Sequence, residues 1–448
     1  MKKILVIGAG RSTYSLLKYL KEHSEAENWK ITIADFNLDW AIEKAEDHPN
    51  AAAVKLDVNN KNERQSLISE ADLVISMLPA HMHVDVAKDC IDFKKNMVTA
   101  SYISKEMEAL DSEAKKAGVI MINEIGVDPG IDHLSAMKVL DEIRDKGGKM
   151  LMFESFTGGL VAPESDNNPW NYKFTWNPRN VVLAGAGGAV KFIQEGQYKY
   201  IPYHQLFRRT EIIEVEGYGR FEGYANRDSL KYRSVYGLKD IPTIYRGTLR
   251  RPGFSRAWDT FVKLGMTDDS YVLEDSENMT FRDFTNTFLA YNPHDSVELK
   301  LMHYLNIPQD SELMDKLTWL GIFDKTKVGI KDATPAQVLQ NILEQKWGMD
   351  PDDHDMIVMY HKFGYELKGE RRMIESSMVS TGRNSKETAM ARTVGLPVAI
   401  AAKNILNGKI TTPGVQIPIT KEIYTPMLEE LAQNEIVFME KELEYSGY

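Results

Sequence analysis

Residues 119–133 read VIMINEIGVDPGIDH, and this stretch decides how the rest of the chain is interpreted. It begins as a short apolar run, typical of a buried strand, and after Asp128-Pro129-Gly130 it continues with apolar residues at helical spacing. A strand therefore ends where a helix begins. The Asp-Pro-Gly corner is expected at the carboxyl edge of a sheet, which is where open α/β sheets bind their ligands.

The first residues predict a turn that can hold a phosphate. The run KKILVIGAG at residues 2–10 predicts a strand that ends in Gly8-x-Gly10; residues 12–23 then form a helical pattern, and residues 30–35 a second strand. In such a βαβ unit the glycines let the backbone approach a pyrophosphate, whose charge the free N–H groups of residues 11–13 can hold. Thr13 stands at the third glycine position, which weakens the match to GxGxxG. Because of the βαβ context, we interpret the turn as a dinucleotide site rather than a plain turn.

Asp35 ends the second strand, where a carboxylate can accept hydrogen bonds from the adenosine ribose hydroxyls and would repel a 2′-phosphate. This predicts NAD in preference to NADP. The alternative is that Asp35 only starts a turn, although Asn37 already serves as the expected N-cap of a helix over residues 38–47.

Apolar runs and helical segments continue to alternate up to residue 125, which predicts a doubly wound parallel sheet covered on both faces. Polar or turn residues follow three of these strands, at 76–79, 100–102 and 127–129, and in such a sheet all three lie along one edge. Tyr102 could donate or accept a proton there, or it could be a half-buried aromatic residue. Asp128 could serve the same site, or it could be an N-cap with Pro129 at the first helical position.

The pattern changes near residue 148 to that of an α+β domain, with nine arginines between residues 200 and 256. Guanidinium groups bind carboxylates through two parallel hydrogen bonds, so the cluster suits a substrate with several carboxylates, although any single arginine is more often a surface residue. Residues 257–348 have the punctuation of helices, which is clearest in the capping box Thr334-Pro-Ala-Gln337. We further expect a glycine-containing helix over 185–193, a hairpin over 355–379, a helix from Ser385 to Val394 that Gly395 ends, another from Pro397, and a helical tail over 425–444.

Composition excludes several classes of protein. A formal net charge of -11 argues against nucleic acid and anionic membranes as partners, because both require clustered cations. A single cysteine excludes an intramolecular disulfide and a CxxC site, and the ten histidines form no HExxH, so we expect no metal. The few apolar residues after Met-Lys-Lys are too short for a signal peptide or a membrane span, and we expect a cytoplasmic protein.

Seven segments resemble, in this order and spacing, saccharopine reductase, the glutamate-forming saccharopine dehydrogenase family of lysine metabolism. They are GAGRST, SMLPAHMH, TASYIS, NEIGVDPGIDH, GGLVAPESDNNPWNYKFTW, NRDS and RGTLR. The resemblance covers nearly the whole chain. It implies a Rossmann domain at 1–130 joined by the C-terminal segment 396–448, an α/β substrate-binding and dimerisation domain at 131–256 and 349–395, and a helical insertion at 257–348. A homodimer is therefore expected.

By matching position, the resemblance also implies the site residues. Cofactor contacts are expected at Gly8, Ala9, Gly10, Arg11, Ser12, Asp35, Phe36, Asn37, Asp57, Val58, Leu78, Ala100, Ser101, Val127, Asp128, Pro129 and Thr175. Substrate contacts are expected at Ser101, Tyr102, Asp128, Arg227, Gly247, Thr248 and Leu249, with Tyr102 and Asp128 as the catalytic pair. Two positions depart from the family: Asp35-Phe36-Asn37 stands where the fungal NADP enzymes carry an arginine, and Thr157 stands where they carry a cysteine.

The reaction implied by the resemblance is the reversible conversion of saccharopine, NAD or NADP and water into L-glutamate, L-2-aminoadipate 6-semialdehyde and the reduced dinucleotide. Saccharopine carries three carboxylates, which suits the arginine-rich segment. Two alternatives stay open: a polyamine reductase of the carboxynorspermidine type, which would need fewer carboxylate-binding groups, and a catalytically silent dinucleotide-binding sensor.

Overall fold

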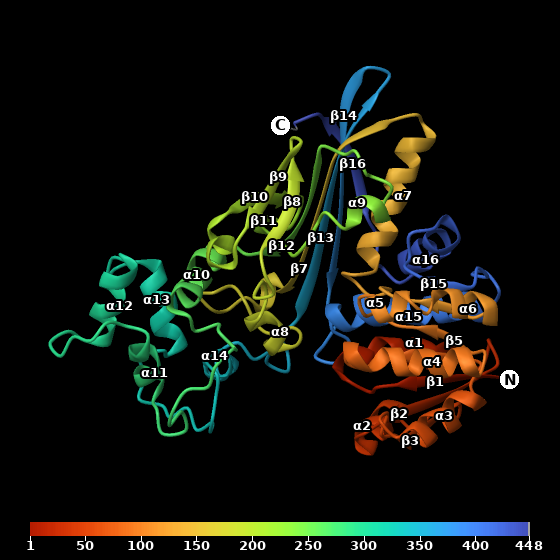
Figure 1. Ribbon diagram of the computed structural model, residues 1–448, viewed down its shortest axis with the longest axis horizontal. Coiled ribbons are helices and arrows are strands. Elements are labelled where there is room, and N and C mark those ends of the chain that lie inside the picture. Colours follow the sequence, from red (N-terminus) through yellow and green to blue (C-terminus); the bar gives the residue numbers. More distant parts are fainter. Residues whose placement is uncertain (447–448) are drawn as a thin grey trace. The chain divides into compact units, whose positions relative to one another are not determined.

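The computed structural model describes residues 1–446, with the backbone alone at Arg11. The chain forms two compact units. Unit 1 contains Met1–Lys149 and Met378–Glu440, and unit 2 contains Met150–Ser377 and the segment that starts at Lys441. Unit 1 is thus made of two stretches far apart in the sequence, drawn in red to orange and in blue (Figure 1).

Unit 1 is built on a seven-stranded sheet in the order β15-β6-β5-β4-β1-β2-β3, and its pairings are parallel. The apolar run at the start of the chain becomes a central strand because residues 4–7 are buried on both faces. The doubly wound sheet predicted from the sequence is confirmed. Its strands are β1 (Lys2–Ile7), β2 (Trp29–Asp35), β3 (Ala51–Lys55), β4 (Leu73–Ser76), β5 (Asn96–Val98), β6 (Ile120–Ile122) and β15 (Gly414–Gln416).

Helices connect these strands and cover the sheet. Polar side chains begin several of them: Asn37 caps α2 as predicted, and Asn60 caps α3. The helices of unit 1 are α1 (Tyr14–His23), α2 (Leu38–Ala45), α3 (Lys61–Glu70), α4 (His83–Asp92), α5 (Lys105–Glu108), α6 (Asp111–Ala117), α7 (Ile131–Asp145), α15 (Ala389–Leu406) and α16 (Lys421–Gln433), with 3-10 turns η1 (Arg11–Thr13) and η2 (Ala80–Met82).

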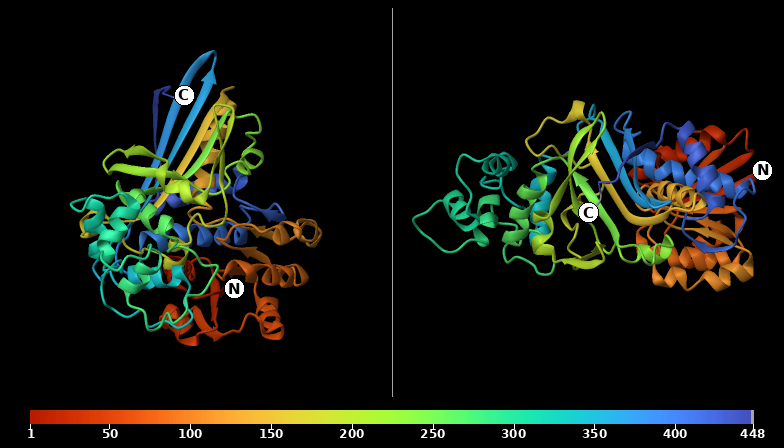
Figure 2. Two further views of the ribbon diagram at one scale, coloured as in Figure 1. Left: turned by 60° about the vertical axis from the view of Figure 1, so that its left-hand side comes forward. Right: turned by 90° about the horizontal axis from the view of Figure 1, so that it is seen from above.

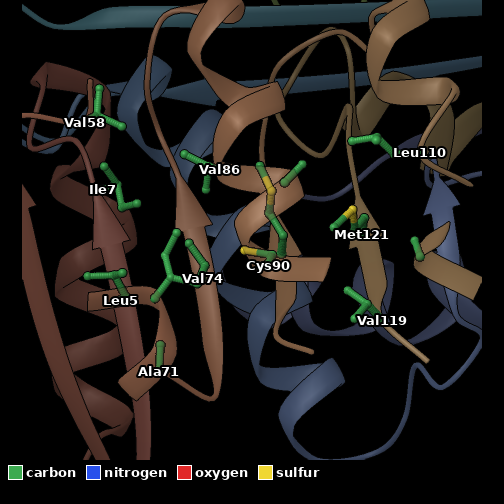
Figure 3. Packing of buried hydrophobic residues seen from close by; sticks show 14 of the residues in the cluster. Leu5, Ile7, Val58, Ala71, Val74, Val86, Cys90, Leu110, Val119 and Met121 are labelled. Carbon is green, nitrogen blue, oxygen red and sulfur yellow. The ribbon is translucent and has the colours of Figure 1, made fainter. Parts of the chain in front are cut away.

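One face of this sheet is covered by an apolar cluster (Figure 3). Leu5 and Ile7 of β1 and Val74 of β4 belong to it together with Val86 and Cys90 of α4, and none of the five is more than 2% exposed. The alternate residues of β1 point to the other face, since side chains alternate along a strand. The cluster fixes α4, and with it the residues at the start of that helix, against the sheet.

The helix α15 is continuous over 18 residues, where the sequence predicted two helices. Its N-cap is Thr388, whose hydroxyl accepts a hydrogen bond from the Ala391 N–H over 2.9 Å, so the cap expected at Ser385 is wrong. Gly395 does not end the helix, because it lies where α15 packs against α1. Pro397 also stays helical, although it gives up one backbone hydrogen bond there.

Unit 2 is built on a mixed nine-stranded sheet in the order β10-β11-β12-β7-β13-β14-β16, with β8 paired to β12 and to β9. β7 runs parallel to β12, while β11 runs antiparallel to its neighbours β10 and β12. Figure 2 shows the long, bent strands β7, β13 and β14 side by side. The strands are β7 (Lys149–Val161), β8 (Val190–Gln194), β9 (Gln197–Ile201), β10 (Thr210–Val215), β11 (Gly219–Ala225), β12 (Thr243–Arg250), β13 (Asp355–Leu367), β14 (Glu370–Thr381) and β16 (Met439–Glu444).

The helices of unit 2 lie mainly between residues 254 and 344, as the sequence pattern predicted. Thr334 forms the predicted capping box: its hydroxyl accepts from the Gln337 N–H, and the Gln337 side chain accepts from the Thr334 N–H over 2.8 Å. The helices are α8 (Pro178–Val182), α9 (Tyr232–Val235), α10 (Phe254–Leu264), α11 (Phe281–Thr287), α12 (Val297–Leu305), α13 (Glu312–Leu320) and α14 (Pro335–Glu344), with 3-10 turns η3 (Pro163–Ser165) and η4 (Tyr203–Arg208).

Two of the local predictions are wrong. The helix expected over residues 185–193 is a turn followed by β8. The helix expected over 425–444 ends at Gln433, and β16 follows it. The hairpin expected over 355–379 is confirmed as β13 and β14. Within residues 1–446, no helix has the length and apolar character that crossing a membrane requires.

Candidate active site

The glycine turn joins β1 to η1 and α1. Gly8 has a φ of +104°, and a Cβ at this position would lie 2.7 Å from the carbonyl oxygen of Met77, so both the backbone and the packing require glycine. A Cβ on Gly10 would meet nothing within 4 Å, so the backbone of the turn borders open space there, as access of a phosphate to the backbone requires. Arg11 and Ser12 lie in η1, directly after the turn, and the side chain of Arg11 is outside the described part of the chain.

Asp35 contacts the glycine turn from the neighbouring strand. Its Oδ2 accepts a hydrogen bond from the Ala9 N–H over 2.7 Å, and its Oδ1 accepts one from the Asn37 N–H over 2.8 Å. A carboxylate has about four acceptor positions, so two remain for a ligand. Phe36 is 70% exposed, and the ammonium of Lys55 lies 5.8 Å from the centre of its ring. The end of β2 thus presents an acidic group and an aromatic face beside the turn.

The segment after β3 is held by a buried ion pair. Asp57 accepts a hydrogen bond from the Asn59 N–H over 3.0 Å. The carbonyl of Val58 accepts one from the guanidinium of Arg64 over 2.6 Å, and Arg64 in turn pairs with Asp89 over 2.5 Å. The backbone of Val58, a predicted cofactor contact, is therefore fixed in place.

Three further strand ends lie along one edge, as predicted, because β4, β5 and β6 are parallel neighbours. Leu78 lies two residues after β4 and Ala100 two residues after β5, and both are half-buried. Val127, in the loop after β6, is 9% exposed. The loops after β5 and β6 are packed closely, since a Cβ on Gly126 would lie 3.2 Å from the Cβ of Ala100.

Tyr102 and Asp128 meet at this edge. The Tyr102 hydroxyl donates a hydrogen bond to Oδ1 of Asp128 over 3.2 Å, and both residues are half-buried. The N-cap considered for Asp128 is wrong, because α7 begins three residues later and its N-cap is Gly130. In the loop between β6 and α7, the Gly126 N–H donates a hydrogen bond to the carbonyl of Pro129 over 2.8 Å. Asp128 is thus a loop residue whose carboxylate is bonded to a phenol, and such a pair can move a proton.

In unit 2, the predicted substrate residues Gly247, Thr248 and Leu249 lie on β12, in the middle of the sheet. A Cβ on Gly247 would lie 2.5 Å from the ring of Phe156 and 2.8 Å from the carbonyl oxygen of Tyr224, so glycine makes room for the ring and the neighbouring strand. Leu249 is fully buried, and only its backbone could reach a ligand. Thr248 is half-buried and is the residue of the three with a polar side chain.

Arg227 is an exposed residue in the loop after β11. Its carbonyl accepts a hydrogen bond from the Lys191 N–H over 3.0 Å. The N–H of Asn226 donates to the carbonyl of Arg246 over 2.8 Å, and the Arg246 N–H donates to Oγ of Ser229 over 3.0 Å. The loop is therefore fixed to the start of the segment Arg246–Arg250, which brings the two predicted substrate segments together.

Some of the nine arginines have a structural role. The guanidinium of Arg246 lies 4.1 Å from the ring centre of Tyr232, and that of Arg250 lies 5.1 Å from the ring centre of Tyr172. Both arginines are buried. Thr175, a predicted cofactor contact, lies in the loop before α8; its Oγ1 is buried and has no hydrogen-bond partner among the described residues.

Comparison with known proteins identifies the family of this chain. Residues 4–122 match the model described as the saccharopine dehydrogenase NADP binding domain, and residues 126–437 match the saccharopine dehydrogenase C-terminal domain. The chain belongs to the saccharopine dehydrogenase family. The resemblance noted in the sequence is thereby confirmed.

Members of the family are similar to this chain along its whole length. The saccharopine dehydrogenase [NADP(+), L-glutamate-forming] of Schizosaccharomyces pombe is 34% identical over 445 residues, which cover 97% of this chain and 98% of that protein. The mitochondrial alpha-aminoadipic semialdehyde synthase of Rattus norvegicus is 35% identical over 98% of this chain, which spans only 47% of that protein. The structure of apo saccharopine dehydrogenase (L-Glu forming) from Saccharomyces cerevisiae superposes with a TM-score of 0.90 at 31% identity, over 99% of this chain and 100% of the other.

The homospermidine synthase of Legionella pneumophila, whose structure contains NAD, superposes with a TM-score of 0.56 at 9% identity and shares the fold alone. This chain therefore spans nearly the full length of its fungal relatives and about half the length of the animal ones.

Sequence reasoning missed a buried histidine at this edge of the sheet. His83, at the start of α4, has Nδ1 2.8 Å from Oγ of Ser76 and Nε2 2.7 Å from Oγ of Ser101. Burial lowers the pKa of its imidazole to about 4, so the ring is neutral near pH 7, and one nitrogen donates while the other accepts. His83 thus links the ends of β4 and β5 at Ser101, a predicted contact residue. The segment SMLPAHMH contains His83, but no local pattern in it indicates a contact with Ser76 and Ser101.

Sequence reasoning also missed a buried pair formed by Glu124, in the loop after β6 that carries Asp128, and His133, in the first turn of α7. Oε2 of Glu124 lies 2.8 Å from Nε2 of His133, and neither residue is more than 3% exposed. Among the described residues, no three His, Cys, Asp or Glu side chains are grouped as metal ligands would be.

Proposed function

We propose that this protein is an NAD- or NADP-dependent oxidoreductase that converts saccharopine and water into L-glutamate and L-2-aminoadipate 6-semialdehyde, reversibly. One observation carries the proposal: a phenol and a carboxylate, Tyr102 and Asp128, are hydrogen-bonded over 3.2 Å at the carboxyl edge of a nucleotide-binding type of sheet. The full-length similarity to fungal proteins named as L-glutamate-forming saccharopine dehydrogenases supports it.

When bound, the dinucleotide supplies the hydride acceptor. In this proposal, the turn at Gly8–Ser12 binds the pyrophosphate of the dinucleotide, and the end of β2 binds its adenosine. The loops after β4, β5 and β6 bind the nicotinamide half. The open space beside Gly10 supports this assignment, because a phosphate needs close access to the backbone N–H groups.

Asp128 and Tyr102 are proposed to orient the secondary amine of saccharopine and to move protons at that nitrogen and at the attacking water. Oxidation of the amine carbon gives an imine, and addition of water then releases glutamate and the semialdehyde. Asp128 is suited to accept a proton and Tyr102 to donate one, since their direct hydrogen bond lets each restore the other. The exposed guanidinium of Arg227 and the hydroxyl of Thr248 are proposed to bind carboxylates of the substrate.

NAD is the proposed preference between the two dinucleotides. The Asp35 carboxylate, which accepts from Ala9 N–H and Asn37 N–H, would meet a 2′-phosphate with like charge. Proteins similar to this chain are named for NADP(+), and Lys55, 5.8 Å from the Phe36 ring, is the cation through which NADP would be accepted. A homodimer is proposed from the resemblance, and light scattering in solution tests it. A cytoplasmic location is proposed from the sequence pattern alone.

The deciding experiment follows the absorbance of reduced nicotinamide with the purified protein, saccharopine, and NAD or NADP in parallel. We expect turnover with saccharopine, a higher kcat/KM with NAD, and L-glutamate as a product. Turnover of carboxynorspermidine in place of saccharopine would assign the polyamine alternative, and dinucleotide binding without turnover of either compound would assign the sensor alternative.

A further inference from the structure

Glu124 has a left-handed backbone conformation, which is unfavourable for a residue with a side chain. Its φ is +54°, in the left-handed region where glycine or asparagine is the usual residue. A buried carboxylate adds a second cost, because Glu124 is only 3% exposed. Because the left-handed backbone and the buried carboxylate both cost free energy, we expect the Glu124 side chain to make contacts that a smaller residue could not make.

Those contacts bracket Tyr102. The backbone N–H of Glu124 donates a hydrogen bond to the carbonyl of Ser101 over 3.0 Å. Its Oε1 accepts one from the N–H of Ile103 over 2.9 Å. The two chain neighbours of Tyr102 are therefore both bonded to one residue, which restricts the backbone from which the phenol projects.

The other carboxylate oxygen reaches the helix that follows the Asp128 loop. Oε2 of Glu124 lies 2.8 Å from Nε2 of His133, in the first turn of α7, and His133 is fully buried. The start of that helix is itself fixed, because the Gly130 N–H donates to Oδ1 of Asp132 over 2.6 Å. Glu124 thus connects the loop of Tyr102 to the helix that ends the loop of Asp128.

We propose that Glu124 and His133 are positioning residues that hold the Tyr102 hydroxyl against the Asp128 carboxylate. This inference rests on the proposed function, because Tyr102 and Asp128 are the catalytic pair in it. Without the Glu124 side chain the Ile103 N–H loses its acceptor, and the loop at residues 101–103 becomes free to move. A displacement near 1 Å of a reacting group can lower a rate about 100-fold.

Two variants of Glu124 show whether kcat depends on the presence of the side chain or on its charge. Glu124→Gly keeps the left-handed backbone and the bond to Ser101, but it removes the side chain. Glu124→Gln keeps an acceptor oxygen for the Ile103 N–H and a side chain of the same length and shape beside His133, without the charge. We expect kcat to fall about 10- to 100-fold in Glu124→Gly with a smaller change in KM for the dinucleotide, and Glu124→Gln to retain most of kcat. Equal and large losses in both variants, or wild-type kcat in Glu124→Gly, would overturn the proposal.

A double-mutant cycle shows whether the effect passes through Tyr102. In a Tyr102→Phe background, Glu124→Gly should lower kcat by less than about twofold, because its target hydroxyl is already absent. If the loss of kcat in the double variant equalled the product of the losses in the two single variants, Glu124 would act independently of Tyr102, which would contradict the proposal. Glu46→Gly is the matched backbone control: it removes another left-handed glutamate of unit 1, paired with Lys21 over 2.5 Å, and should leave kcat unchanged.

Hydrogen exchange provides a readout that needs no substrate. The Ile103 amide should exchange at least tenfold faster in Glu124→Gly than in the wild type and in Glu46→Gly, and unchanged exchange there would overturn the proposal. Absence of saccharopine turnover by the wild-type protein would instead overturn the proposed function, while the exchange result would still decide whether Glu124 holds the loop.

Discussion

Replacement of Gly395 by alanine should loosen the contact between α15 and α1. A Cβ at Gly395 would lie 2.8 Å from the backbone nitrogen of Leu16 and 3.2 Å from the carbonyl oxygen of Ser12. Ordinary contacts begin at 3.4 Å, so the two helices must separate by roughly 0.6 Å at the closest point. Backbone atoms cannot turn away as a flexible side chain can, and the strain must be shared by both helices.

The magnitude follows from two opposing terms. Overpacking of a tight contact costs about 1–3 kcal/mol, while alanine in a helix interior gains about 0.5–1 kcal/mol over glycine. The difference between these terms centres on a net loss of about 1 kcal/mol, which should lower the Tm of unit 1 by roughly 2–4 °C, for a unit of about 200 residues. Because Ser12 belongs to the turn after the glycines, dinucleotide binding should weaken as well, about tenfold for each 1.4 kcal/mol that reaches the turn.

Calorimetry with and without dinucleotide measures both effects. Gly187→Ala is a suitable control, because a Cβ there would meet nothing within 4 Å. A Tm for Gly395→Ala equal to or above the wild-type value would refute the reasoning, since it would mean that the helices accommodate the methyl group without strain.

The remaining predictions concern the site and the stability of each unit. Asp128→Asn should lower kcat about 100- to 10,000-fold while the Tm stays near wild type, because Asp128 does not cap α7; kinetics and calorimetry on one preparation test this, and turnover near wild type would contradict the catalytic assignment. Asp35→Ala removes the acceptor of the Ala9 N–H and should lower the ratio of kcat/KM for NAD to that for NADP by about tenfold; an unchanged ratio would argue against the NAD assignment. In the folded protein the pKa of His83 is about 4, below the value near 6.5 in the unfolded chain. The unfolded chain therefore binds the proton first as the pH falls. The free energy of unfolding should decrease between pH 6.5 and 4, by about 3 kcal/mol in total. His83→Gln should reduce that acid-dependent loss in denaturant titrations at several pH values, and an identical pH profile would show that other groups carry it. Thr334→Ala should destabilise unit 2 by about 1 kcal/mol, and urea unfolding followed at its tryptophans would show no change if the capping box were dispensable.

Features that depend on neighbouring residues in the sequence were predictable. The capping box at Thr334 and the N-cap at Asn37 are local, and both were confirmed. The glycine turn and the order of strands and helices in unit 1 follow from apolar spacing in the same way. The sheet type then places the carboxyl ends of β4, β5 and β6 along one edge, which is why the meeting of Tyr102 and Asp128 could be anticipated.

Features set by distant contacts were not predictable. Gly395 was expected to end one helix and Pro397 to start another, yet α15 runs through both residues and packs against α1. Asp128 read as a cap because Pro follows it, but backbone hydrogen bonds within the loop move the start of the helix to Ile131. No local pattern could show that His83 would lie between two serines that are 25 positions apart in the chain.

The strand β15 at Gly414–Gln416 has a consequence for the order in which the protein can fold. It pairs with β6 at the edge of the unit 1 sheet, and α15 packs on α1 from a similarly distant part of the chain. A ribosome that has already released the glycine turn must add about 400 further residues before these partners exist. During that interval the edge of β6 and the apolar face that receives α15 stay uncovered, and they are candidates for chaperone binding or for pairing with another nascent chain. Removal of residues 399–448 should therefore impair the dinucleotide site, although the glycine turn lies about 400 residues away in the sequence.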